Sequence, residues 1–246
     1  MSDRYKYGAV PSSCLEVALD SALGPPTPKG FFDPALTTTM EKKYYMHPKI
    51  AEFWCCISSF VYAGGLLVYA LQTEDWWKGW IALGHIPSYV HLANVLGIFT
   101  AVASSVYHAY LWEGCGSCDC SLAIVLWLAC VLTCFGLPFV YQVCVLCPVI
   151  AVFACLWRRA TKLAVVCGAV VFPFSIWSCI LFGWMWGATV LSLLLAGIVC
   201  FLLDRLNIYP LHTFWHIFSG AAVTVSMFAC MQHGPGSSFF GGSEWM

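Results

Sequence analysis

The sequence has few charged residues for its length. Only 9% of its 246 residues are Asp, Glu, Lys or Arg, whereas 61% are hydrophobic. A soluble domain carries roughly 25% charged residues because its surface must face water. The shortage of charge therefore excludes a soluble fold and indicates a membrane protein. The formal net charge is −1, and the absence of a run of basic residues argues against nucleic-acid binding.

A hydrophobic signal sequence is also lacking at the start of the chain. Residues 1–49 are polar, are broken by several prolines and include the acidic residues Glu16 and Asp20. This composition matches neither a secretory signal nor a simple transit peptide. We expect residues 1–49 to form an extended N-terminal arm outside the bilayer.

Long apolar runs follow this arm. Each of seven runs approaches the length of about 20 residues that crosses a bilayer as a helix. They lie near 50–71, 89–111, 120–136, 139–157, 161–182, 185–203 and 211–231. The sequence therefore predicts an all-α membrane protein, a seven-transmembrane-helix bundle over residues 50–232, with a C-terminal tail over 233–246. No internal repeat and no second domain is expected.

Cysteine is abundant, with fifteen residues. Most of them lie in apolar runs, where a thiol behaves as a small hydrophobic group, so they do not indicate a redox compartment. Cys115, Cys118 and Cys120 stand apart because they flank an aspartate next to a predicted turn over 114–118. They could bind a metal or form a disulfide, and a single Cys-x-x-Cys leaves both alternatives open.

Five polar residues lie within or beside the predicted spans, where ionisable groups are costly and indicate function. Ser104 and His108 are four apart and share one face near the end of the second span. His212 and His216 do the same at the start of the last span, and Asp119 opens the third. Because even spans end and odd spans begin on the N-terminal side, we expect all five residues at one membrane face.

These residue types indicate a metal site. Three neutral imidazoles with an open fourth position for water form a common catalytic zinc arrangement. A carboxylate such as Asp119 beside that water could accept its proton as general base. Two simpler interpretations stay open. A histidine near a helix end is often only hydrogen-bonded, and Asp119 could cap the third span.

The spacing resembles the alkaline ceramidase family, part of a membrane-hydrolase superfamily that also includes the adiponectin-receptor-like proteins. The family pattern is a serine four before a histidine, an aspartate eleven beyond it, and His-x-x-x-His in the last span. Each position is matched here, by Ser104, His108, Asp119, His212 and His216. The stretch Ile-Ala-Glu-Phe-Trp at 50–54 is also similar to the opening of the family's first span, and the resemblance covers about residues 41–220.

The resemblance implies a zinc-dependent lipid amidohydrolase of sphingolipid metabolism. In that family three histidines hold zinc, which implies His108, His212 and His216 as ligands. Asp119 would be the base or orienting partner of the water, and Ser104 a donor to the developing oxyanion. The substrate would be ceramide, cleaved to a fatty acid and a sphingoid base. The implied location is the endoplasmic reticulum or the Golgi.

Two features depart from the family. Its members carry an acidic calcium-binding segment before the first span, but here only Glu41 and Glu52 remain as acids, and Lys43 stands where an oxygen ligand belongs. Since Ca²⁺ takes 6–8 oxygen ligands, we predict that no calcium binds. The Lys and Arg distribution also places the N-terminus in the cytoplasm or in the matrix of a mitochondrial inner membrane, whereas the family's N-terminus faces the lumen.

Two alternatives follow from these departures. The chain could keep zinc and hydrolyse another acylated lipid, or it could be a structural subunit of a larger membrane complex that retains an inherited site. In the second case the N-terminal arm and the tail would dock protein partners. The sequence leaves the acyl-chain length, the organelle and the oligomeric state open.

Overall fold

The computed structural model describes residues 30–35, 38–65, 88–181 and 184–233. Within these ranges the chain is almost entirely helical, and its only β pairing is two isolated bridges. The elements are α2 (Phe53–Ser58), η1 (Ser59–Ala63), α5 (Ser88–Tyr110), α6 (Glu113–Cys134), α7 (Phe139–Cys155), η3 (Trp157–Arg159), α8 (Ala160–Leu181), α9 (Trp184–Arg205) and α10 (His212–His233). The all-α prediction is confirmed. The end of the predicted first span, beyond residue 65, lies outside the described residues.

Five of these helical segments are long and apolar enough to cross a membrane. They are Val90–Tyr110, Glu113–Cys134, Trp157–Ile180, Met185–Arg205 and His212–Met231. Two further apolar segments, Phe53–Ala63 and Phe139–Cys155, are shorter. The chain is therefore an integral, multi-pass membrane protein.

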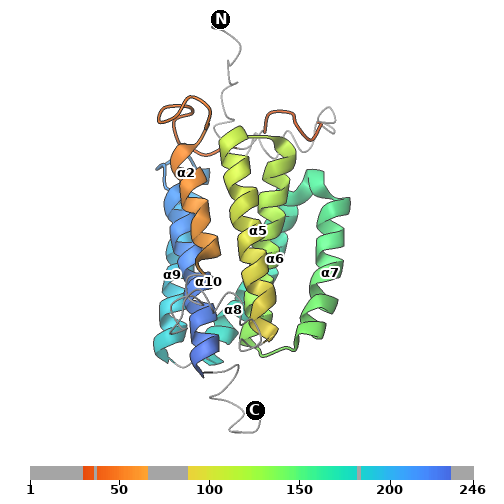
Figure 1. The fold of residues 1–246 in the computed structure, drawn as a ribbon. Helices are drawn as coiled ribbons and strands as arrows, with labels where there is room; N and C mark the ends of the chain where they lie inside the picture. Colours follow the sequence, from red (N-terminus) through yellow and green to blue (C-terminus); the bar gives the residue numbers. More distant parts are fainter. Residues whose placement is uncertain (1–29, 36–37, 66–87, 182–183, 234–246) are drawn as a thin grey trace, which may run out of the picture.

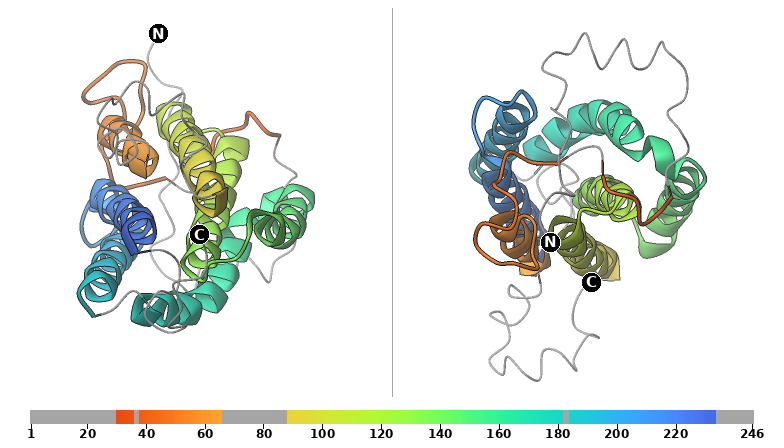
Figure 2. Two further views of the ribbon diagram at one scale, coloured as in Figure 1. Left: turned by 60° about the horizontal axis from the view of Figure 1, so that its bottom comes forward. Right: turned by 90° about the horizontal axis from the view of Figure 1, so that it is seen from above.

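Helices that follow one another in the chain from α5 to α10 run in opposite directions (Figure 1). As a result the end of α5 and the starts of α6 and α10 lie at the same end of the bundle, together with the described part of the N-terminal arm. Viewed along the bundle, α2, α10, α9, α8, α6 and α5 follow one another around a ring, while α7 packs outside against α6 (Figure 2). The ring brings the predicted polar residues to one end, as the alternation of the spans requires.

The start of α6 differs from the prediction. The expected turn over 114–118 is helical, because α6 already begins at Glu113. The chain reverses direction three residues before position 114, at Leu111, whose φ of 52° is in the left-handed region. Trp112 then occupies the N-cap position, so Asp119 lies in the second turn of α6 and does not cap it.

Close packing explains the two glycines that suggested a turn. A Cβ at Gly114 would lie 2.1 Å from the Phe31 ring, and one at Gly116 would lie 2.8 Å from the Tyr107 ring. Real Cβ atoms do not approach this closely. The glycines therefore let the N-terminal arm and α5 pack directly against α6, and tertiary contact outweighs their low helix propensity.

Candidate metal centre

Three buried histidines converge at the end of the bundle where the described part of the N-terminal arm lies, which we call the arm end. His108 comes from the last turn of α5, and His212 and His216 come from the first two turns of α10, where a spacing of four places them on one face. Each offers a ring nitrogen, and these nitrogens lie within 4.8 Å of one another. The ring centroids are 5.3 Å apart for His108 and His212, 4.9 Å for His108 and His216, and 4.8 Å for His212 and His216. The structure thus brings together the three predicted ligands.

Two of the three imidazole rings have hydrogen-bond partners outside the histidine cluster. The Nδ1 of His108 lies 2.6 Å from Glu52 Oε2. The Nδ1 of His216 lies 3.0 Å from the Ser58 hydroxyl and 3.1 Å from the carbonyl oxygen of Cys55. An outer partner on one nitrogen fixes the ring orientation and leaves the other nitrogen for a ligand, as is usual for metal-binding histidines. For His108 and His216 the nitrogen left over is Nε2.

The third ring has a looser outer partner. The Nδ1 of His212 lies 3.4 Å from Asp204 Oδ2, near the end of α9, and forms no hydrogen bond within the described residues. Asp204 is itself buried and accepts a long hydrogen bond from the backbone N–H of Met40. All three histidines therefore have an acceptor on the Nδ1 side.

An unsatisfied nitrogen at the centre supports a metal. His108 Nε2 is buried and has no hydrogen-bond partner among the described residues. Burying a polar group without a partner costs roughly 1–3 kcal/mol in proteins. A cation bound by three imidazole nitrogens would remove that cost, and zinc accepts this donor set, with Zn–N distances of about 2.0–2.1 Å. The residues present fit a zinc ion.

Glu52 links the histidines to the arm. Its side chain is fully buried, and its Oε1 accepts the backbone N–H of Thr39 at 2.9 Å and contacts Lys43 Nζ. Lys43 Nζ also donates to the Thr39 carbonyl at 2.7 Å. Glu41, the other remaining acid, instead accepts the backbone N–H groups that begin α2. The two acids thus serve different partners, and the absence of calcium stays a prediction.

Asp119 and Ser104 have different surroundings. Asp119 is partly buried and lines a cavity together with His212 and His216. Its carboxylate accepts a hydrogen bond from the Ser104 hydroxyl. Ser104 is fully buried, is not part of the cavity wall, and has its oxygen 2.9 Å from the Ser59 hydroxyl. The structure places Ser104 behind Asp119.

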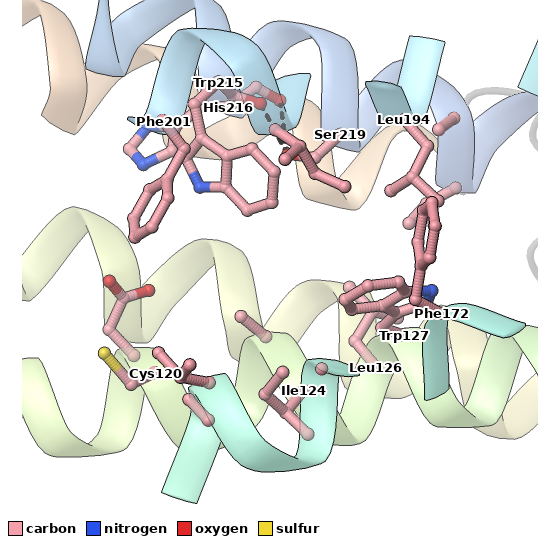
Figure 3. Close-up of a pocket in the computed structure, with 18 of the residues that line it drawn as sticks. Cys120, Ile124, Leu126, Trp127, Phe172, Leu194, Phe201, Trp215, His216 and Ser219 are labelled. Carbon is pink, nitrogen blue, oxygen red and sulfur yellow. Dashed lines mark hydrogen bonds between the residues drawn. The ribbon is translucent and has the colours of Figure 1, made fainter. Parts of the chain in front are cut away.

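The cavity beside the histidines is large and mostly apolar. Its volume is about 680 Å³, within the range of 300–1,000 Å³ that holds small ligands. It lies between α6, α8, α9 and α10. Figure 3 shows the side chains of Phe201, Trp215 and His216 towards one end, and those of Trp127, Phe172 and Leu194 towards the other. The shape suits an elongated apolar group whose polar end lies at the histidines.

The three cysteines that flank Asp119 form no candidate metal group of their own among the described residues. Cys115, Cys118 and Cys120 are free thiols on the first turns of α6, and they belong to neither of the metal-binding groups found among the described residues. One of those groups is the three histidines. The other, formed by Glu52, Cys55 and His108, shares His108 with it and so belongs to the same centre.

Two partners of the histidines were missed from the sequence. Glu52 was considered as part of the 50–54 stretch and as a remaining acid of a calcium segment, not as a partner of a histidine, and Asp204 was not considered. The signal for Asp204 was present, since it is an acid at the end of the sixth apolar run, on the same membrane face as His212. No comparable signal links Glu52 to His108, which lies 56 residues away.

Comparison with models of known protein families gave no match, and comparison with curated proteins found no relative. The fold and the site together define an integral, multi-pass α-helical membrane protein with a buried three-histidine cluster above an apolar cavity.

Proposed function

We propose that this protein is a zinc-dependent intramembrane hydrolase that cleaves the amide-linked acyl chain of a ceramide-like lipid. The observation that carries the proposal is a cluster of three buried imidazoles, two of which, those of His212 and His216, line an apolar cavity together with Asp119. The spacing shared with alkaline ceramidases supports the same reaction. In this proposal α2 with the residues after it and α7 complete a seven-span bundle, in a membrane of the endoplasmic reticulum or Golgi.

The chemistry divides between the metal and the protein. Zinc held by His108, His212 and His216 would supply Lewis acidity and lower the pKa of water to about 7. The role of Asp119 would be that of general base, taking up a proton from the water that adds to the acyl carbonyl. The proton then passes to the amine as the C–N bond breaks, which releases a fatty acid and a sphingoid base.

Ser104 acts behind Asp119 in this scheme. Direct donation to the oxyanion, which the resemblance implies, would require Ser104 to reach the cavity, and it is not part of the cavity wall. Its contact with the Asp119 carboxylate suits a residue that orients the base. Ser104 therefore contributes as a positioning residue.

Substrate assays with metal analysis test the proposal. The full-length protein, purified in detergent, is analysed for bound metals and incubated with an N-acylsphingosine and, separately, with a phospholipid. We expect about one zinc per chain and release of a fatty acid from the N-acylsphingosine, both lost in His212→Ala. His91→Gln, on the same helix as His108 but near its opposite end, is the matched control and should retain both. Zinc without hydrolysis of either lipid would favour a structural subunit, and release from the phospholipid alone would change the substrate class.

A further inference from the structure

A buried carboxylate connects a lysine of the N-terminal arm to a histidine of the proposed metal centre. The two oxygens of Glu52 have separate partners. Oε1 contacts Lys43 Nζ and the Thr39 N–H, whereas Oε2 lies 2.6 Å from His108 Nδ1. The Glu52 side chain is fully buried, and that of Lys43 is 18% exposed.

The backbone holds this arrangement in place. The N–H of Glu52 donates to the carbonyl of His108 at 3.0 Å, and that of Ala51 donates to the carbonyl of Ala109, also at 3.0 Å. The N–H of Tyr44, next to Lys43, donates to the carbonyl of Ala51 at 2.8 Å. The chain around Lys43 is therefore bonded to the chain around Glu52, which is bonded to the end of α5.

We propose that Lys43 is a positioning residue of the metal centre and acts through Glu52. Its ammonium group is the fixed positive partner that keeps the Glu52 carboxylate in place. Glu52 then accepts the Nδ1–H of His108, which leaves Nε2 of His108 directed at the other two histidines. The effect on metal affinity rests on the proposed function, whereas the effect on His108 does not.

The charges explain why a cation is needed. A buried carboxylate is strongly destabilised unless it is paired and hydrogen-bonded. A histidine that binds a metal is neutral, so His108 offers Glu52 a hydrogen bond but no compensating charge. The backbone N–H of Thr39 is neutral too. Among the described residues Lys43 is the only Lys or Arg in an ion pair with Glu52.

Metal affinity is the first test. The dissociation constant of zinc is measured in detergent by competition with a chromophoric chelator. Loss of an outer partner of a metal ligand typically weakens binding by 10–100-fold. We expect a weakening of this size in Lys43→Met, which keeps the length of the side chain, and less than about threefold in Lys43→Arg. Lys42→Met is the matched control, because Lys42 is exposed and lies over the Tyr45 ring. Equal affinities for Lys43→Met and Lys42→Met would overturn the proposal.

A double-mutant cycle tests whether Lys43 works through Glu52. If it does, Glu52→Gln combined with Lys43→Met should bind zinc no more weakly than Glu52→Gln alone. Additive losses would mean that Lys43 acts by another route, and would overturn the proposal.

A readout on the metal-free protein separates this inference from the proposed function. In protein labelled with ¹⁵N-histidine, the Nδ1–H of His108 bonded to a carboxylate should give a downfield proton signal, assigned by its loss in His108→Gln. We expect the signal to persist in Lys42→Met and Lys43→Arg and to shift or disappear in Lys43→Met. If zinc does not bind even to the wild type, the proposed function fails, and this signal alone decides the role of Lys43. An unchanged signal in Lys43→Met would contradict that role.

Discussion

The side chains inside the helix bundle make different kinds of contact near its two ends. At the arm end, buried histidines, carboxylates and hydroxyls meet in specific pairs, such as His108 with Glu52 and His216 with Ser58. At the opposite end, apolar side chains and thiols form most of the core, and the buried amides of Asn94 and Gln142 donate to backbone carbonyls. Cys134 of α6 and Cys230 of α10 lie there with their sulfur atoms 4.0 Å apart, inside one apolar cluster with Met227.

This difference distinguishes contacts that serve function from contacts that serve packing. Lipid tails are as apolar as a helix surface, so helices in a membrane associate mainly through close packing and polar contacts between them. Close packing of apolar side chains and thiols dominates at the thiol end. The polar pairs at the arm end are expensive to bury, so they need a compensating role, and the proposed cation at the three imidazoles would provide one. Substitutions at the two ends should therefore affect different properties.

Removal of a histidine ligand should have the largest effect. His212→Ala or His216→Ala leaves two imidazoles, and we expect zinc affinity to fall by at least about a thousandfold, which corresponds to roughly 4 kcal/mol. Metal content and chelator competition measure this loss, and thermal unfolding of the metal-free protein checks that the bundle still folds. A variant that retained one zinc per chain would show that these histidines are structural.

Removal of the proposed base should abolish the reaction and spare the metal. Asp119→Ala is expected to lower the rate of lipid hydrolysis by about 10²–10⁴-fold, the usual contribution of a general base. The zinc content should stay close to one per chain because Asp119 is not a ligand. Asp33→Asn, at an exposed position of the arm, serves as the control. Loss of zinc together with activity would instead assign Asp119 to the metal.

A substitution at the thiol end should lower stability and spare zinc binding. Met227 is completely buried, and truncation of such a side chain typically costs 2–5 kcal/mol of stability. We expect Met227→Ala to lower the free energy of unfolding in detergent by about this amount and to leave zinc affinity within about twofold, since Met227 lies about three turns beyond His216 along α10. A matched loss of zinc affinity would mean that the two ends are coupled.

The sequence was sufficient to predict an all-α membrane protein and the end of the bundle at which the histidines meet, whereas the count of seven spans stays a prediction. Span lengths follow from bilayer thickness, and the alternation of span directions fixes which ends lie together. This is why His108 and His212 were expected side by side despite a separation of 104 residues in the sequence. The start of α6 was wrong because Gly114 and Gly116 resemble turn residues, and only the contacts with Phe31 and Tyr107 reveal their packing role.

The partners of the histidines were harder to predict because they depend on tertiary contact. Glu52 reaches His108 through backbone hydrogen bonds between the start of α2 and the end of α5, and no local pattern encodes that pairing. Ser104 shares a helix face with His108, as its spacing requires. Its distance from the cavity wall depends on Ser59, which comes from another helix. Spacing therefore predicted the ligand set, while the role of each residue behind it required the fold.

The smallest effect on zinc affinity is expected for substitution of Asp204. It allows two outer partners of the histidines at the arm end, Asp204 and Glu52, to be compared. The contact between Asp204 Oδ2 and His212 Nδ1 is 3.4 Å long, whereas Glu52 lies 2.6 Å from His108. A longer contact orients a ring less strongly, so Asp204→Asn should weaken zinc binding by only about tenfold, the low end for outer partners. Glu52→Gln should weaken it more, because it also leaves Lys43 without its partner carboxylate. Chelator competition on the two variants ranks them directly. If Asp204→Asn proved the more damaging, the Asp204 contact must shorten when the metal binds, and His212 rather than His108 would be the more firmly oriented ligand.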